Sequence, residues 1–247
     1  MRTFALYTAK GGTGKSTAAA NLAAALALRG RRVLVVDVDA QASAGRLLGV
    51  APAEGLLDVL RSGEGLEELV AKTGVEGVEL VPASAELARA ERVLGREPGA
   101  ERLLALALEA LPAGRWDAVL VDCPPGVGLL SVGALAAAEE HLAPIEPSPL
   151  AVAGLGDALE LADAIRARLN PRLGPTRLLL SRVPRTRAAT LTAAGLREKL
   201  GERVLRTEIP ERAVVVEASA RREPVVTYAP ESPAAEAFRA LAEEVEG

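Results

Sequence analysis

The chain has 247 residues, of which 49% are hydrophobic and only 2% aromatic, and its formal net charge is −4. This length suits one α/β domain. Because aromatic side chains are so few, its core must be built from Ala, Val and Leu. The charged fraction of 25% excludes a disordered composition. The single cysteine excludes an internal disulfide and favours the cytosol, and no apolar run is long enough to cross a membrane.

Apolar segments alternate with helical ones along the chain. Strands are expected at residues 3–8, 32–37, 78–81, 117–122, 141–145, 176–181 and 204–206. Helices are expected at residues 16–29, 84–95, 100–111, 129–139, 152–169, 188–200 and 232–245, with short helices and loops over residues 45–75. Continuous apolar strands between helices predict a three-layer, doubly wound α/β fold with a mostly parallel sheet, as one domain over residues 1–247.

A glycine-rich loop joins the first expected strand to the first expected helix. Its sequence is AKGGTGKST over residues 9–17, which is typical of a phosphate-binding loop in this position. Glycines let consecutive N–H groups turn inward, and the helix N-terminus adds the positive end of its dipole. We expect Lys15 to reach the β- and γ-phosphates, Ser16 to ligate Mg²⁺ and Thr17 to bond an oxygen nearer the base. The expected nucleotide contacts in this loop are Lys10, Gly11, Gly12, Thr13, Gly14, Lys15, Ser16 and Thr17.

The loop departs from the general phosphate-loop pattern at its start. Ala9 stands where that pattern has its first glycine, and a second lysine, Lys10, follows it. Lysine occurs elsewhere only at Lys72 and Lys199, and every other basic residue is arginine, so two compact ammonium groups in one loop are distinctive. The segment KGGTGKST resembles the deviant Walker A box of the ParA/MinD family of P-loop ATPases. The resemblance implies an ATP-sandwiched homodimer in which Lys10 reaches the partner's phosphates, where a cation offsets charge on the transferring phosphoryl group.

Three aspartates end two of the expected strands. Asp37 and Asp39 occur in VVDVDAQAS, and alternation along a strand would put both on one face. Asp122 occurs in VLVDCPPG, after a run of apolar residues. The family resemblance implies that Asp37 and Asp122 support the Mg²⁺ site and that Asp39 orients the attacking water. A carboxylate beside Mg²⁺ and phosphate is a weak base, so we expect slow intrinsic ATP hydrolysis. Each aspartate by itself would also suit a cap or a turn.

The single cysteine and the single histidine are not expected to be catalytic. Cys123 lies beside Asp122 with no histidine near it in sequence, and we interpret it as a packing residue. His141 begins an expected strand, where a structural role is favoured. One cysteine and one histidine make a zinc site improbable.

Base recognition is expected from the second half of the chain. The resemblance continues through residues 209–245, but Ser181 stands where family members often have asparagine. Ser181, Pro210 and Glu211 are therefore candidate neighbours of the adenine. The chain has no Asn-Lys-x-Asp motif for reading guanine, which favours ATP over GTP.

Basic residues are concentrated at residues 166–222, where 14 Lys/Arg face 5 Asp/Glu. No aromatic residue lies between them, which disfavours base stacking and favours sequence-independent contact with DNA phosphates. A solvated arginine-rich surface is the alternative interpretation. The candidate DNA contacts are Arg182, Arg185, Arg187, Arg221 and Arg222.

The resemblance favours a ParA-type partition or cargo-positioning ATPase: a cytoplasmic, nucleoid-associated dimer that binds DNA non-specifically and is stimulated by a ParB-like partner. No separate DNA-reading domain is expected, because the phosphate loop begins at residue 9. A MinD-type membrane-cycling ATPase is the alternative, disfavoured by an acidic end with Glu243, Glu244 and Glu246. A metal-cluster relative would need more cysteines, and a small-molecule synthetase would need substrate groups that the sequence does not reveal.

Overall fold

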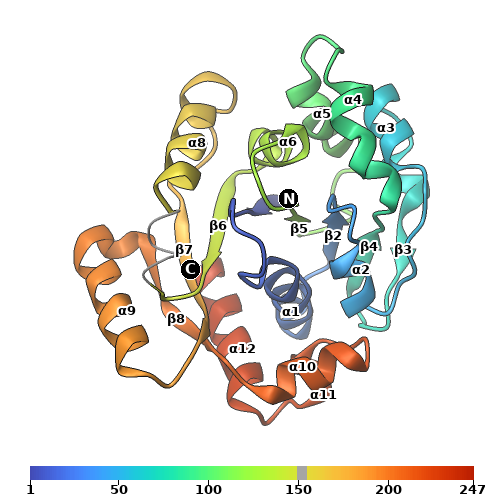
Figure 1. Cartoon of the computed structure of the whole chain (residues 1–247). Helices are drawn as coiled ribbons and strands as arrows, with labels where there is room; N and C mark the ends of the chain where they lie inside the picture. The colour runs from blue at the N-terminus through green and yellow to red at the C-terminus, as the bar shows by residue number, and fades with distance from the viewer. Residues whose placement is uncertain (149–154) are drawn as a thin grey trace.

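The computed structural model describes residues 1–148 and 155–247 (Figure 1). One sheet runs through the molecule in the strand order β3-β4-β2-β5-β1-β6-β7-β8. Neighbouring strands are parallel except for β3, which runs antiparallel to β4. The strands are β1 (Arg2–Leu6), β2 (Val33–Asp37), β3 (Ala71–Lys72), β4 (Val78–Val81), β5 (Ala118–Asp122), β6 (Glu140–Ile145), β7 (Arg177–Val183) and β8 (Val204–Pro210).

Helices cover both faces of this sheet. The α-helices are α1 (Lys15–Leu28), α2 (Ser43–Leu47), α3 (Leu56–Ser62), α4 (Ala90–Leu94), α5 (Leu103–Glu109), α6 (Leu129–Ala137), α8 (Leu155–Arg168), α9 (Arg187–Leu200), α10 (Ala213–Ala220), α11 (Val225–Tyr228) and α12 (Pro233–Glu246). Short 3₁₀ turns lie at Leu66–Leu69, Ala85–Arg89, Ala100–Arg102 and Gly201–Arg203. None of the described helices is long and apolar enough to cross a membrane.

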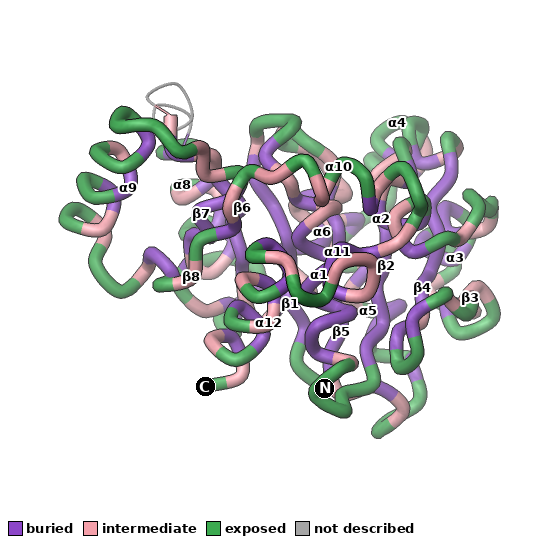
Figure 2. The backbone as a smooth tube through the Cα atoms, turned by 90° about the horizontal axis from the view of Figure 1, so that it is seen from below, coloured by how far each residue is buried: buried purple, intermediate pink, exposed green. Residues whose placement is uncertain are grey.

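Alternating side chains of the central strands build two apolar cores. On β1, Phe4 and Leu6 face a core shared with α1, α2, α11 and α12, while Ala5 faces the core under α3, α5, α6 and α8. A smaller cluster joins β6, β7 and β8 to α8 and α9 on that second side. Figure 2 shows the buried strands between helices whose outer sides are exposed. The expected three-layer, doubly wound fold is confirmed.

Several elements differ from the sequence prediction. The antiparallel edge strand β3 was not expected, because two residues carry no periodic signal. The helices expected at 84–95 and 100–111 each begin as a 3₁₀ turn before α4 and α5. Strand β8 continues to Pro210, beyond the expected residues 204–206. For the helix expected at 152–169, residues 152–154 lie outside the described part, and α8 accounts for the rest.

Helices α10 and α11 were also missed. The run Val214, Val215 and Val216 in α10 is β-branched, which favours a strand, and the N-cap residue Arg212 makes no side-chain capping bond. Helix α11 packs against α1 and α12, while α10 packs against α11 and buries Ala218 in the same core, so tertiary packing decides their conformation.

The strand order creates a crevice where β1, β2 and β5 end. In the strand order, β2 and β5 lie on one side of β1, and β6 lies on the other side. The connection from β1 to β2 and the connection from β5 to β6 therefore run in opposite directions across the sheet. In the parallel register, Asp122 is level with both Leu6 and Asp37. Ligands of open α/β sheets bind outside the carboxyl ends of strands at such a switch point.

Candidate nucleotide-binding site

The loop after β1 has the backbone of an anion-binding turn. Gly12 and Gly14 have φ angles of 76° and 91°, which side chains with a Cβ rarely adopt, and α1 begins at Lys15. The buried Thr8 and Thr13 hydroxyls lie 2.9 Å apart and tie the two ends of the loop together. A Cβ on Gly14 would lie 2.9 Å from Ser181 Oγ, which adds to the positive φ in favouring glycine at this position. The loop thus presents backbone N–H groups at a helix N-terminus.

The two loop lysines lie in opposite environments. Lys15 is buried, and its Nζ donates to the Lys10 carbonyl at 3.2 Å. Burial lowers the pKa of Lys15, while the Asp122, Cys123 and Asp39 side chains oppose that shift. Lys10 is exposed, and its ammonium has no hydrogen bond or ion pair within the described residues. Lys15 therefore points into the site, whereas Lys10 is free to reach outward.

Two buried carboxylates lie side by side at the strand ends. Asp37 accepts hydrogen bonds from the N–H groups of Asp39 at 3.0 Å and Gly45 at 3.2 Å. Neither carboxylate oxygen of Asp122 has a hydrogen-bond partner among the described residues. Burial raises the pKa of Asp37 to about 6 and that of Asp122 well above its ordinary value, and the Asp37 carboxylate raises the pKa of Asp122 further. The Ser16 hydroxyl is close enough to lower the pKa of Asp122 without making a regular hydrogen bond.

These unpaired oxygens fit a divalent cation. Buried carboxylates without a donor are costly unless a cation approaches them. The described part of the chain contains no group of three or more His, Cys, Asp or Glu side chains that would hold a metal ion by itself. Mg²⁺ is commonly held by one or two carboxylates together with water and substrate phosphates. The residues present, Ser16 with Asp37 and Asp122 behind it, match that donor set.

Asp39 and the loop after β5 border the same site. Asp39 is partly exposed and lines the cavity, with its Oδ1 accepting the Gln41 N–H at 2.9 Å. The Gly126 N–H donates to the Ala9 carbonyl at 2.8 Å, which fastens the loop after β5 to the phosphate loop. The Ser131 hydroxyl donates to the Gly126 carbonyl at 3.0 Å and steadies that loop. The phosphate loop and the loop after β5 are therefore linked, so a movement of one would displace the other.

Cys123 and His141 have structural positions, as expected. Cys123 is fully buried, and burial raises the pKa of its thiol, which keeps it protonated. His141 is buried between the Tyr7 carbonyl, 3.0 Å from its Nε2, and the Thr176 hydroxyl, 2.9 Å from its Nδ1. The carbonyl can only accept, so Nε2 donates and Nδ1 accepts. Burial lowers the pKa of His141 to about 4, so the ring is neutral at pH 7.

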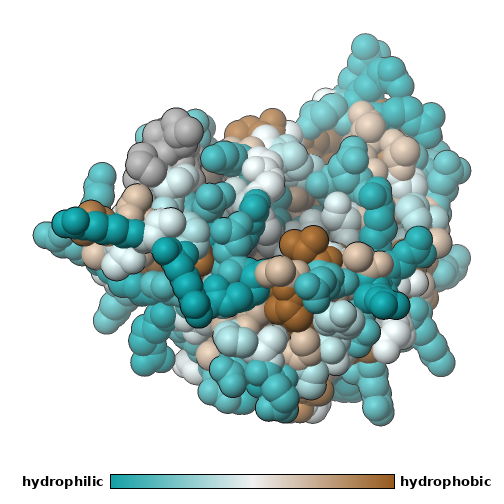
Figure 3. All heavy atoms as spheres, turned by 60° about the horizontal axis from the view of Figure 1, so that its bottom comes forward, coloured by the Kyte–Doolittle hydropathy of each residue, from teal (hydrophilic) through white to brown (hydrophobic). Residues whose placement is uncertain are grey.

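A cavity of about 680 Å³ extends from the phosphate loop to α10. The three residues expected near the adenine, Ser181, Pro210 and Glu211, all line it. Sequence reasoning missed further lining residues from β8, from α2 and α10, and from the loops before these two helices: Gln41, Ser43, Arg46, Leu47, Ile209, Arg212, Val215, Val216 and Ser219. Val216 is 71% exposed, and Figure 3, turned to bring this lower part of the molecule forward, shows apolar groups among hydrophilic ones. The apolar run after Pro210 was the available sequence signal.

The five candidate DNA arginines do not share one location. Arg182 lines the cavity, and its guanidinium donates to the Gly12 carbonyl at 2.8 Å. Arg185 and Arg187 lie exposed at the beginning of α9, whereas Arg221 and Arg222 lie exposed at the end of α10. The structure therefore places Arg182 with the nucleotide site, and the others on two separate surfaces.

Much of the basic segment is neutralised by acidic side chains. Arg166, Arg177, Arg197 and Arg206 form ion pairs with Asp163, Glu140, Glu208 and Glu244 respectively. Three of these partners, Asp163, Glu140 and Glu244, lie outside residues 166–222 in the sequence. The charge excess seen in the sequence therefore overstates the basic surface.

Comparisons with known proteins agree with this geometry. A family model described as an AAA domain matches residues 1–174. The chain is 41% identical to the chromosome-partitioning ATPase Soj of Thermus thermophilus, over 99% of this chain and 95% of that protein. Among solved structures, cobyrinic acid a,c-diamide synthase from Mycobacterium smegmatis with an ATP analogue and magnesium superposes with a TM-score of 0.86 at 30% identity, covering 100% and 94% of the chains. The cell division ATPase MinD of Pyrococcus furiosus superposes with a TM-score of 0.81 at 31% identity, covering 99% and 98%.

Proposed function

We propose that this chain, which belongs to the ParA/MinD family of deviant Walker A P-loop ATPases, is a ParA-type partition ATPase. As a member of that family it is an ATPase that uses ATP and Mg²⁺. In our proposal, residues 1–247 act as one domain, and ATP assembles two copies into a dimer that binds DNA without sequence preference. A ParB-like partner on a chromosome, plasmid or other cargo then stimulates hydrolysis. The protein would act in the cytoplasm on the nucleoid.

The proposed chemistry needs positioned charge rather than a covalent intermediate. The backbone N–H groups of residues 11–16 and the Lys15 ammonium would bind the phosphates, and Asp39 would orient the attacking water. Mg²⁺, when bound beside Ser16, supplies charge that screens the β- and γ-phosphates. Asp37 and Asp122 would hold the water shell of that ion. Asp39 is a weak base there, which agrees with slow turnover until a partner acts.

The observation that carries the dimer is the contrast between the two loop lysines. Lys15 supplies the cation that the chain's own cavity needs, while the exposed Lys10 does not line that cavity. An ammonium held at the mouth of a phosphate site, yet directed outward, fits phosphates bound by a second copy.

Two observations weigh against other activities on this fold. A MinD-type membrane cycle needs an amphipathic helix that is free to lie on lipid, and α12 is not free in this way because Phe238, Leu241 and Val245 are buried in the core. The chain is 41% identical to the chromosome-partitioning ATPase Soj but only 30% identical to the cobyrinic acid synthase. A partition ATPase is therefore the function that we favour.

Sedimentation velocity with Mg²⁺ and ATP tests the dimer. Asp39→Ala should slow hydrolysis and accumulate dimers, whereas Asp39→Ala combined with Lys10→Ala should remain monomeric while still binding nucleotide. Lys72→Ala replaces another exposed lysine and should leave the Asp39→Ala dimer intact. Monomers in every sample at saturating nucleotide would refute the proposal.

A further inference from the structure

Arg182 lies at an irregularity of the sheet that directs its side chain. Leu180 pairs with Glu208 and Val183 pairs with Pro210, so Ser181 and Arg182 together oppose a single residue of β8. Such a β-bulge turns one side chain away from the alternation of its strand, and bulges are frequent beside functional sites. Arg182 has a φ of 51°, a conformation that residues with a Cβ adopt rarely. A strained backbone at the edge of a ligand cavity suggests a functional reason.

The guanidinium of Arg182 bridges the two sides of the cavity. Its Nη1 donates to the Gly12 carbonyl at 2.8 Å, and its Nη2 lies 3.5 Å from Glu211 Oε1. Gly12 belongs to the phosphate loop, while Glu211 follows β8 on the side expected to receive the base. The planar, forked donor set of arginine suits two acceptors at once.

The hydrogen bond to Gly12 has a consequence for the next amide. The carbonyl of Gly12 and the N–H of Thr13 belong to one trans peptide and point in opposite directions. Gly12 has a φ of 76° and no Cβ, so little in its own backbone prevents this peptide from turning over. By holding the carbonyl on its own side, Arg182 keeps the Thr13 N–H on the other side.

We propose that Arg182 is a positioning residue that fixes the Gly12–Thr13 peptide in the orientation in which the phosphate loop binds a nucleoside diphosphate or triphosphate, with Glu211 anchoring the guanidinium. This inference rests on the proposed nucleotide site. Because loop N–H groups hold the phosphates that ADP and ATP share, the effect falls on both nucleotides alike. Arg182 acts on binding, so KM should rise in its variants while kcat at saturating ATP stays close to the wild-type value.

The test compares Arg182→Gly, Arg182→Lys and the matched surface variant Arg92→Ala, using calorimetric titration with ADP and with a slowly hydrolysed ATP analogue. Arg182→Gly should weaken the binding of both nucleotides about tenfold, which corresponds to removing one charge-assisted hydrogen bond. Lysine, with a single donor point, should restore part of that affinity, and Arg92→Ala should bind as the wild type does. The melting temperature of nucleotide-free Arg182→Gly should not fall, since glycine accepts the positive φ without strain.

Three results would overturn the inference. The first is an unchanged affinity of Arg182→Gly for both nucleotides. The second is a weakening confined to the ATP analogue, which would indicate direct contact with the γ-phosphate. The third is a lowered melting temperature, which would indicate a purely structural role. Failure of the proposed site itself looks different, because the wild-type protein would then bind neither nucleotide.

Discussion

At the scale of single residues, burial decides which charges act inside the site. Lys15 is buried near the carboxylates of Asp122 and Asp39. Lys10 is exposed, and its ammonium has no ion pair within the described residues. Asp39 differs from Asp37 and Asp122 in being open to the cavity. A water molecule can therefore reach Asp39, whereas Asp37 and Asp122 are closed off from solvent at the ends of β2 and β5.

We expect Asp39→Ala to bind ATP but to hydrolyse it at least about 100-fold more slowly, because orienting or deprotonating the attacking water contributes rate and not affinity. Phosphate release at saturating ATP and Mg²⁺ measures the rate, and titration measures binding. Asp58→Ala removes an exposed aspartate of α3 and serves as the control. Unchanged turnover in Asp39→Ala would remove this residue from the mechanism.

The buried His141 gives a prediction for stability against pH. Its folded pKa of about 4 lies below the ordinary value of 6.5, so the unfolded chain binds the proton more readily between these values. The free energy of unfolding should therefore fall as pH drops from about 6.5 to about 4, by up to about 3 kcal/mol from this group.

Urea denaturation of the wild type and of His141→Gln, followed by circular dichroism, separates this contribution from the carboxylates. The variant should be less stable at pH 7, and its stability should change less over the same pH range. Since the chain has one histidine, equal pH dependence in both proteins would contradict the assignment.

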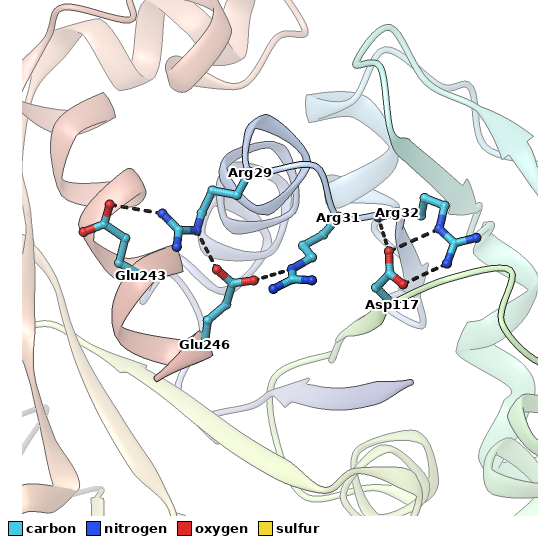
Figure 4. A network of polar contacts seen from close by, with 6 residues as sticks. All are labelled: Arg29, Arg31, Arg32, Asp117, Glu243 and Glu246. Atoms are coloured by element: carbon cyan, nitrogen blue, oxygen red, sulfur yellow. Dashed lines mark hydrogen bonds and ion pairs between the residues drawn. The ribbon is translucent and has the colours of Figure 1, made fainter.

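At the scale of elements, α12 closes the fold through its apolar face and its charged end. Phe238 and Leu241 are buried in the core shared with α1. At the tip of the helix, Glu246 accepts hydrogen bonds from Arg29 and Arg31, each at 2.5 Å (Figure 4). These two interactions differ in kind, because the first removes apolar surface from water and the second joins partly exposed ions.

Phe238→Ala should lower the free energy of unfolding by about 3–5 kcal/mol, since it leaves a cavity in the core. Glu246→Gln should lower it by about 1 kcal/mol or less, and less again in high salt. Urea denaturation at two salt concentrations measures both variants. A larger effect of Glu246→Gln than of Phe238→Ala would show that the ion pairs, and not the packed face, hold α12 in place.

At the scale of the whole molecule, the proposed DNA surface must come from the arginines that remain unpaired. Arg221 and Arg222 are exposed at the end of α10 and have no ion pair within the described residues. Because α10 also lines the nucleotide cavity, a nucleotide-dependent dimer would bring two copies of this region near one face.

Arg221→Glu combined with Arg222→Glu should weaken DNA binding and reduce the slope of log affinity against log salt by about 2, which is about one for each phosphate that is no longer neutralised. The ATPase rate measured without DNA should equal that of the wild type. Arg92→Glu combined with Arg96→Glu changes the same charge around the end of α4, away from α10 in Figure 1, and is the control. Equal DNA binding in the two double variants would show that the α10 surface makes no specific contribution.

The phosphate loop and the central strands could be predicted from the sequence, because their determinants are consecutive residues. Glycine spacing, Lys15 and Ser16 specify an anion-binding turn within a few positions, and unbroken apolar runs specify buried parallel strands. The aspartates at strand ends were found for the same reason. Short β3 and helices α10 and α11 were not predicted, since their conformations depend on neighbours far along the chain.

The tertiary structure alone decided which distant residues meet. The parallel register brings Asp37 level with Asp122, and the bulge in β7 turns Arg182 toward Gly12, 170 residues away. Ion pairs with Glu140 and Glu244 also remove charge that the sequence counts as free. Register, bulges and pairing depend on how strands and helices pack together, and no local pattern of residue types encodes that packing.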